Sequence, residues 1–378
     1  MTSDPKKSKI RTKFRKKHQP RARKGDLTRD YQQHGFDDEA TVYNERISGK
    51  GDLTRHKTII GDHAADASSG FDVHLHVDEE QCLAGRVLSV HGLSSVVETL
   101  DGKRFQCATR QLLKSLSTEQ RHVVASGDRV LFRPENENEG LIERIEPRHG
   151  VLSRTSRNRQ HVIVTNVDQL LIVVSAAEPT LKPNLIDRFL ITAEKANITA
   201  VICINKIDLV DPADLQPLIG VYGQMGYHVQ LVSAETGFGI QALREIVKDQ
   251  ETVLAGQSGV GKSTILNQVE PGLDLRVDEV SSDNQKGRHT TTAATLLPLS
   301  FGGYVVDTPG IRQLELWDVI GEEVAGFFRD LRPYINHCRF PNCTHTHEKS
   351  CAVKDAVADG QLDTRRYDSY CQLATPET

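Results

Sequence analysis

The sequence predicts a multidomain fold in which a small β-barrel, a parallel α/β domain and a mainly helical domain follow one another. Three observations support this: short strands separated by turns between residues 82 and 148, longer apolar strands alternating with helices from residue 161, and a cysteine-rich stretch at 338–351. At 378 residues the chain is long enough for two or three such units. We expect four segments, namely 1–76 as a basic, largely disordered arm and linker, then domains at 77–150, 151–317 and 318–378.

The composition is typical of a soluble globular protein. No apolar run approaches the roughly 18 residues of a membrane span, and the N-terminus lacks a secretory signal. Seven cysteines, an odd number, do not suggest a disulfide framework. We therefore expect a cytoplasmic protein with no membrane partner, and we expect it to be a monomer.

Charge is distributed unevenly along the chain. Residues 1–30 carry a net charge of +9, although the formal net charge of the whole chain is -4. The run from Lys6 to Lys24 has almost no apolar residues, so it cannot fold alone. We interpret it as a disordered arm that binds nucleic acid, with RNA as the favoured target; a solubilising tail is the alternative. The hexapeptide Lys-Gly-Asp-Leu-Thr-Arg occurs at 24–29 and again at 50–55 without a physical explanation.

The segment from about Cys82 to Arg148 predicts a five-stranded barrel. A turn at Asp101-Gly102 joins two of the strands into a hairpin. The expected strands are Gly85–Val90, Ser95–Thr99, Lys103–Cys107, Asp128–Phe132 and Gly140–Ile145. Five short strands in so few residues favour an OB-fold, a barrel that commonly presents one face to oligonucleotides. The alternative is a small β-domain that only packs against its neighbour.

Parallel α/β structure is expected from His161 onward. Strands at His161–Val164 and Gln169–Val174 precede a helix with Pro183 in its opening turn. This arrangement places the loops that follow the strands at one edge of a sheet.

A phosphate-binding loop is predicted between the apolar run Glu251–Ala255 and a helical segment that begins near Ile265. The stretch from 256 to 264 has the spacing G-x-x-x-x-G-K-[ST], in which glycines let backbone amides approach phosphate oxygens. Lys262 would reach the β- and γ-phosphates and serve catalysis, and Ser263 would bind magnesium. A glycine turn that binds nothing is the alternative. The expected nucleotide contacts are Gly256, Gln257, Ser258, Gly259, Val260, Gly261, Lys262, Ser263 and Thr264.

Two further loops are expected to read the base. Asp208 offers only acceptors, which match the adjacent ring N–H and amino group of guanine, and Lys206 can lay its stem along the ring. Asn205 can bond a base edge and brace a neighbouring loop. A later loop that begins at Ser233 resembles the second guanine-contacting loop of GTPases. The expected base-side residues are Asn205, Lys206, Ile207, Asp208, Ser233 and Ala234.

The γ-phosphate side is predicted from Asp307-Thr308-Pro309-Gly310 and from the polar run 286–292. Asp307 would hold magnesium through water, and the amide of Gly310 would approach the γ-phosphate. Thr291 is the favoured magnesium ligand of the polar run, with Thr290 and Thr292 as alternatives. An ordinary polar loop is the other interpretation of this run.

The order of the motifs indicates circular permutation. The guanine loops near 205 and 233 precede the phosphate loop at 256, whereas ordinary GTPases have the phosphate loop first. The γ-phosphate side therefore leads directly into the C-terminal segment.

A structural zinc site is predicted in the stretch 338–351. Three cysteines and a histidine supply the four ligands of a closed tetrahedral site, here Cys338, Cys343, His345 and Cys351. Spacing alone leaves His347 and His337 as alternatives, and three unpaired cysteines would be the simpler interpretation.

Together these motifs resemble the small ribosomal subunit biogenesis GTPase RsgA (YjeQ) family. The resemblance covers about Gly85 to Cys371 and includes the Gly287-Arg288-His289-Thr290 run and the C-x4-C-x-H-x5-C cluster. It implies a bacterial cytoplasmic GTPase with OB-fold, permuted GTPase and zinc-binding domains. It also implies that the small subunit is bound late in its maturation and stimulates hydrolysis. The segment before about His76 is longer than the family pattern requires.

The water-positioning group is not the usual one. Many GTPases have glutamine directly after the D-x-x-G glycine, where this chain has Ile311. Our hypothesis is that His289 positions the water when rRNA orders its loop. A nucleotide-gated module of a protein assembly is the rival function. A zinc hydrolase is disfavoured because four protein ligands leave no open position.

Overall fold

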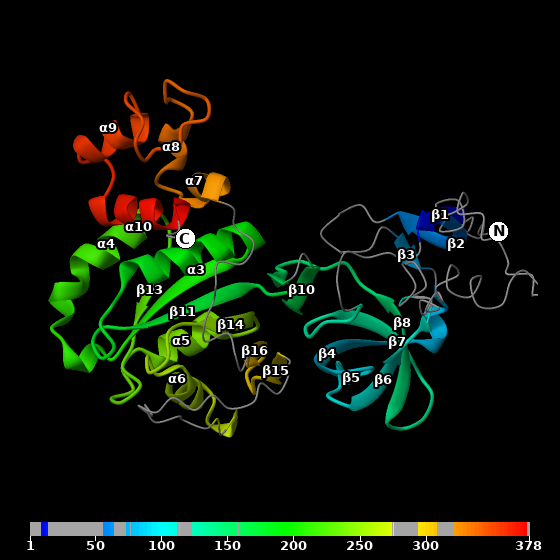
Figure 1. Cartoon of the computed structure of the whole chain (residues 1–378). Coiled ribbons are helices and arrows are strands. Elements are labelled where there is room, and N and C mark those ends of the chain that lie inside the picture. Colours follow the sequence, from blue (N-terminus) through cyan, green and yellow to red (C-terminus); the bar gives the residue numbers. More distant parts are fainter. Residues whose placement is uncertain are drawn as a thin grey trace, which may run out of the picture.

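The computed structural model consists of a barrel, a central sheet with helices on both faces, and a group of C-terminal helices, as Figure 1 shows. This order of a barrel, an α/β unit and a mainly helical unit confirms the predicted fold class. No helix in the described part of the chain is long and apolar enough to cross a membrane. The structure describes residues 9–13, 56–63, 73–75, 77–111, 113, 123–156, 159–273, 275, 294–307 and 321–375.

The barrel closes in the strand order β4-β5-β6-β8-β7. Its strands are β4 (Leu83–His91), β5 (Ser94–Thr99), β6 (Arg104–Thr109), β7 (Arg129–Pro134) and β8 (Glu139–Ile145). Only β6 and β8 pair in parallel, which is the five-stranded OB topology that the sequence predicted. The Phe132 ring fills the interior, and a Cβ at Gly85 or Gly140 would press against that ring. These glycines therefore allow the barrel to close around a phenylalanine.

Three strands precede the barrel and form a small antiparallel sheet, β1 (Lys9–Lys13), β2 (His56–His63) and β3 (Val73–Leu75). The expectation of a largely disordered arm did not include them. β1 lies inside the basic run, and its pairing partner is β2, far along the chain. A local reading of composition cannot find a strand that depends on so distant a partner.

The central sheet has the strand order β13-β12-β11-β14-β16-β15, and only β15 is antiparallel to its neighbour. Its strands are β11 (Gln169–Ser175), β12 (Thr199–Asn205), β13 (His228–Leu231), β14 (Glu251–Ala255), β15 (Thr295–Pro298) and β16 (Tyr304–Asp307). Every residue of β11 and β14 is buried. Their continuous apolar runs are typical of parallel strands covered on both faces.

One strand assignment was wrong. The run at His161–Val164 was expected to open the parallel sheet, but it lies in β10 (Arg159–Val164), which pairs antiparallel with β9 (Leu152–Ser156). This hairpin connects the barrel to the central sheet. A short apolar run fits a parallel sheet or an antiparallel hairpin equally well, and here it pairs with β9, the strand directly before it in the chain.

Helices cover both faces of the sheet. On one face, α3 (Pro183–Ala196) and α4 (Gln216–Gln224) pack on the even-numbered residues of β11. On the other, α5 (Ile240–Val247) and α6 (Lys262–Val269) pack on the odd-numbered ones. Pro183 stands in the first turn of α3 as predicted, where a missing N–H costs nothing.

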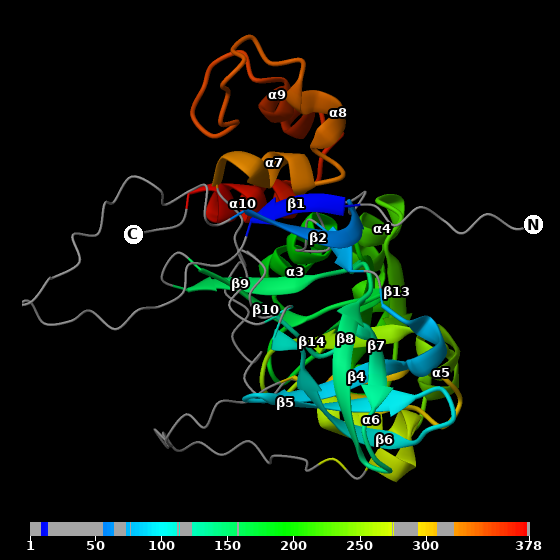
Figure 2. The ribbon, with the colours of Figure 1, turned by 90° about the vertical axis from the view of Figure 1, so that its right-hand side faces the viewer.

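Within residues 321–375, the described part of the C-terminal unit, four α-helices share a hydrophobic core that also includes Ile191 of α3. They are α7 (Val324–Phe327), α8 (Arg332–Ile335), α9 (Ala352–Ala358) and α10 (Thr364–Ala374). Figures 1 and 2 show α7 and α10 lying over α3. Arg366 of α10 is almost completely buried there and forms ion pairs with Asp187 of α3 and with Asp330.

Candidate functional site

The predicted nucleotide loops meet at one edge of the central sheet. β12, β13, β14 and β16 are parallel, so the loops that follow them leave the sheet on the same side. This carboxyl edge is where open α/β sheets bind ligands. The structure thus brings together three stretches that lie far apart in the sequence, at 205–208, 233–234 and 256–264.

The phosphate loop runs from β14 into α6, which begins at Lys262. Gly256, Gly259 and Gly261 have φ values of 150°, 82° and 91°, a region that favours glycine. A Cβ at Gly261 would collide with the side-chain amide of Asn205, so the loop also needs glycine for space. The Nζ of Lys262 donates to the carbonyls of Gly256 and Gln257, each at 2.8 Å, and therefore lies across the loop.

Asn205 connects its own loop to the phosphate loop and to the loop that begins at Ser233. Its side chain is buried at the end of β12, where Nδ2 donates to the carbonyl of Val260 at 2.8 Å. Its Oδ1 accepts from the backbone amide of Ala234 at 3.1 Å. These bonds agree with the bracing role expected of Asn205, while its contact with a base edge stays a prediction.

Asp208 and Ser233 meet on the base side. The Ser233 hydroxyl donates to Asp208 Oδ1 at 2.5 Å and accepts from the amide of Thr236 at 3.1 Å. Asp208 stands in the short helix η5 (Ile207–Leu209), whose first residue Ile207 is buried. One carboxylate oxygen is therefore fixed by the serine loop, which orients the group that the sequence assigned to guanine.

Lys206 has a partner that the sequence did not suggest. Its φ is 61°, in the left-handed region, and its Nζ donates to the carbonyl of Glu178 at 2.6 Å. Glu178 lies in the loop after β11, at the same carboxyl edge. The strand order could have revealed this loop, because β11 lies between β12 and β14.

Part of the γ-phosphate side lies outside the described residues, namely His289, Thr290, Thr291, Thr292, Gly310 and Ile311. Asp307 is the last residue of β16 and is paired in register with Thr295 of β15. Val306 is paired with Val253 of β14, so the end of β16 stands beside the strand that leads into the phosphate loop. Magnesium binding by Ser263, Thr291 and Asp307 stays a prediction.

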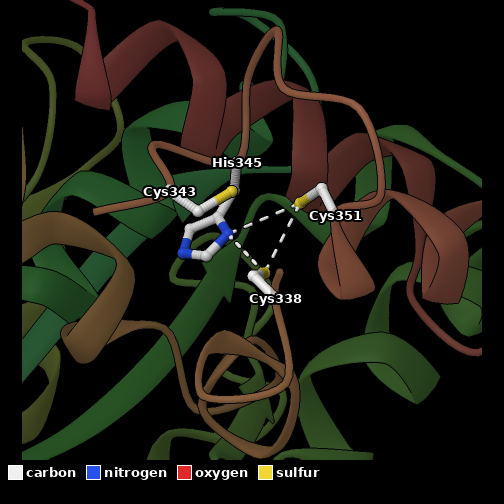
Figure 3. Close-up of side chains that lie close together, drawn as sticks. All are labelled: Cys338, Cys343, His345 and Cys351. Carbon is white, nitrogen blue, oxygen red and sulfur yellow. Dashed lines mark hydrogen bonds between the residues drawn. The ribbon is translucent and has the colours of Figure 1, made fainter. Parts of the chain in front are cut away.

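The second site is a compact cluster of Cys338, Cys343, His345 and Cys351, drawn in Figure 3. Their four ligand atoms lie within 4.8 Å of one another. The Sγ of Cys338 is 3.3 Å from His345 Nδ1 and 3.8 Å from Cys351 Sγ, which is 3.5 Å from the same nitrogen. Ligands of a tetrahedral zinc ion are roughly 3.5 to 3.8 Å apart, so this set fits a metal of that size.

The alternative histidine ligands are not in this cluster. His347 is exposed, and its Nε2 lies 3.8 Å from Glu348. Burial raises the pKa of the Cys343 thiol to about 12 and also raises the pKa of Cys351. These thiols therefore keep their protons until a bound cation displaces them.

The loop that carries His345 is organised by Glu348, which the sequence did not single out. Its carboxylate accepts from the amide and the hydroxyl of Thr344, both at 2.7 Å, and from the amide of Thr346 at 3.2 Å. Tyr367 of α10 donates to the carbonyl of His345 at 2.8 Å. Such hydrogen bonds to a ligand loop are typical of metal sites, where residues around the ligands orient them.

An OB barrel followed by a P-loop sheet, with base-side loops before the phosphate loop, defines the class of this protein. It is a circularly permuted GTPase.

Comparison with known proteins places the chain within this class. The RsgA GTPase family model matches residues 145–317. The small ribosomal subunit biogenesis GTPase RsgA of Chlorobaculum parvum is 38% identical over 304 residues, which cover 78% of this chain and 97% of that protein. The RsgA of Gemmatimonas aurantiaca is 41% identical over 291 residues, with 75% and 94% covered.

Two solved structures have the same architecture. YjeQ from Thermotoga maritima gives a TM-score of 0.65 at 36% identity and covers 78% of this chain and 97% of its own. YloQ, described as a circularly permuted GTPase, gives 0.62 at 29% identity, with 80% and 99% covered. The chain belongs to the RsgA GTPase family.

Proposed function

We propose that this protein hydrolyses GTP on the small ribosomal subunit during late maturation, and that the subunit and its rRNA stimulate hydrolysis. The relatives are named for biogenesis of that subunit. The observation that carries the GTP assignment is the Asn205 side chain, which bonds both the phosphate loop and the serine loop. A base held at Asp208 and phosphates held at 256–264 would thus belong to one preorganised site.

The residues divide into three roles in this proposal. Asp208, Lys206 and Ser233 bind guanine, and the 256–264 loop binds the phosphates with Lys262 neutralising charge. Ser263, Thr291 and Asp307, with the Gly310 amide nearby, hold magnesium and the γ-phosphate. The metal in the cysteine cluster is zinc, and it has a structural role because the cluster supplies four protein ligands.

Hydrolysis needs a group that positions the attacking water, and we assign this role to His289. Ile311 cannot perform it, because its side chain has no hydrogen-bonding atom. Turnover by the free protein should therefore be slow and should rise when rRNA orders the loop. An unchanged stimulated rate in His289→Ala would remove His289 from the mechanism.

The basic arm contributes to RNA binding in this proposal. Neutralising phosphates releases counterions, so deletion of residues 1–24 should reduce the salt dependence of subunit binding. A slope that is equal with and without the arm would leave it as a solubilising tail. The expectations of a monomer and of a cytoplasmic location stay predictions.

The direct test is GTP hydrolysis by the full chain alone, with small subunits and with large subunits. Strong stimulation by small subunits only is the expected result. Equal rates in all three reactions would contradict the proposal and would direct the search for a partner to proteins.

A further inference from the structure

Two pairs of registered residues take part in the contact between the barrel and the central sheet. Arg86 of β4 stands opposite Glu98 of β5, and Glu251 of β14 stands opposite Tyr304 of β16. Arg86 forms an ion pair with Glu251, and the Tyr304 hydroxyl donates to Glu98 Oε2 at 3.2 Å. Each strand pair therefore supplies one partner to each of the two interactions.

Three of these four residues are more than nine-tenths buried, Tyr304 being the exception. Burial lowers the pKa of Arg86 to about 10, so the guanidinium remains charged at neutral pH. Glu98 also accepts from Arg104 Nε at 3.0 Å. Buried ion pairs are weak sources of stability, but they fix the geometry of the groups that they join.

A third interaction reaches the strand at the sheet edge. The Ser126 hydroxyl donates to the carbonyl of Ala294 at 2.6 Å, and both residues are buried. The Ser126 carbonyl accepts from the amide of Thr165 at 3.0 Å. The Thr165 hydroxyl bonds to Asp128, which forms a fully buried ion pair with Arg148. This network of buried hydrogen bonds therefore fixes the position of Ser126.

We define the barrel–sheet contact as these three interactions, Arg86–Glu251, Tyr304–Glu98 and Ser126–Ala294. Two of them reach the first residues of β14 and β16, strands that lead into the phosphate side of the site, and the third reaches Ala294, just before β15. β14 runs into Gly256, and β16 ends at Asp307. Ala294 directly precedes Thr295, the registered partner of Asp307.

We propose that Ser126 and Tyr304 are positioning residues, through which a partner bound at the barrel shifts the end of β16 and so changes the rate of hydrolysis. The identity of that partner, the small ribosomal subunit, rests on the proposed function. Coupling between two sites is reciprocal in binding free energy. The nucleotide state must therefore also affect the barrel.

The first test compares hydrolysis, with and without small subunits, in the full chain and in Ser126→Ala and Tyr304→Phe. Each change removes one hydroxyl. Basal rates should stay within about twofold, while the stimulated rate should fall about fivefold, the effect of one hydrogen bond of ordinary strength. Stimulation at the wild-type level in both variants would overturn the proposal.

Ser95→Ala is the matched control. Ser95 is a buried serine of β5 whose registered neighbours, Val90 and Cys107, both belong to the barrel. It should retain full stimulation. A loss equal to that of Ser126→Ala would show that barrel stability, rather than the contact with Ala294, controls the rate.

The second test needs no ribosome. Hydrogen exchange in segment 123–128 is compared with GDP and with a non-hydrolysable GTP analogue bound. The exchange should depend on the nucleotide in the wild type and not in Ser126→Ala. No dependence in the wild type would contradict the coupling. Dependence in a protein that small subunits fail to stimulate would support the coupling and contradict the proposed function instead.

Discussion

The central domain is attached to its two neighbours by different structural elements. The barrel–sheet contact reaches β14 and β16, whose ends carry the phosphate loop and Asp307. The C-terminal helices attach to α3 on one face of the sheet, where Arg366 bonds Asp187 and Asp330. Strands that end in a site can transmit a displacement to it directly. We infer that the barrel influences the nucleotide site, whereas the C-terminal unit stabilises the molecule.

Metal removal should have the largest effect, and that effect should be confined to the C-terminal helices. Binding of a structural zinc ion contributes on the order of 10 kcal/mol to folding. A chelator, or Cys351→Ser, should therefore unfold 321–375, measured by circular dichroism, and leave GTP affinity within a few fold.

Cys371→Ser is the control, because Cys371 lies in α10 outside the ligand set. This variant should keep both its helices and its metal. Loss of GTP binding together with the metal would contradict the inference that the C-terminal unit does not act on the nucleotide site.

The attachment of the C-terminal helices should depend strongly on Arg366. Arg366→Met leaves the buried Asp187 and the partly buried Asp330 without their cation, which costs about 3 to 5 kcal/mol. Urea denaturation measures this loss. The neighbouring Arg365 pairs at the surface with Asp363, so Arg365→Met should cost about 1 kcal/mol or less. Equal losses in the two variants would show that the buried network has no special role.

A change in the base-side loop should affect the ligand and leave both attachments intact. Asp208→Asn presents a donor where guanine also donates, so GTP affinity should fall about a hundredfold, and xanthine nucleotides should be accepted. Isothermal titration measures both. Asp211→Asn is the control, because the Asp211 side chain accepts from the amide of Ala213 and caps a short helix after the base-side loop. An unchanged preference for GTP in Asp208→Asn would contradict the assignment of the base site.

The smallest effect concerns pH and the loop of the metal cluster. Although burial opposes it, hydrogen bonds from the hydroxyl and amide of Thr344 lower the pKa of Glu348 to about 2. A lowered carboxyl pKa adds stability that is complete above the unfolded value, about 4.3, and is lost as pH falls toward 2.

The expected contribution of this carboxylate is about 1 kcal/mol after screening by solvent. Acid unfolding of the wild type and of Glu348→Gln measures it, and their difference separates the carboxylate from metal release. Identical acid-unfolding curves would show that the hydrogen bonds of Glu348 do not stabilise the loop.

Local sequence patterns were sufficient for the barrel and for the turn between β14 and α6. Glycine spacing predicts the turn at Gly256 to Gly261. Alternation of polar and apolar residues predicts strands such as β6 without knowledge of distant partners, and the burial of β6 alternates accordingly. The three cysteines of the metal cluster lie within fourteen residues, so spacing identified them. Spacing left three histidines open, and the structure places His345 in the cluster.

Features that depend on distant pairing were not predictable in this way. β1 pairs with β2, Arg366 bonds Asp187, and Lys206 bonds the carbonyl of Glu178, each across a long stretch of chain. Nothing near Arg366 in the sequence indicates a buried partner. The barrel–sheet contact belongs to the same group, because register across two strand pairs places its residues together.

Two tyrosines permit the most direct test of the difference between the attachments. Tyr304 donates to Glu98 in the barrel–sheet contact, and Tyr222 donates to Asp187 beside Arg366 at 2.8 Å. The measurement is GTP hydrolysis with small ribosomal subunits by Tyr304→Phe and Tyr222→Phe, each relative to its own basal rate. We predict that Tyr304→Phe loses most of the stimulation and that Tyr222→Phe keeps it. Equal loss in both variants, or loss in Tyr222→Phe alone, would contradict the account.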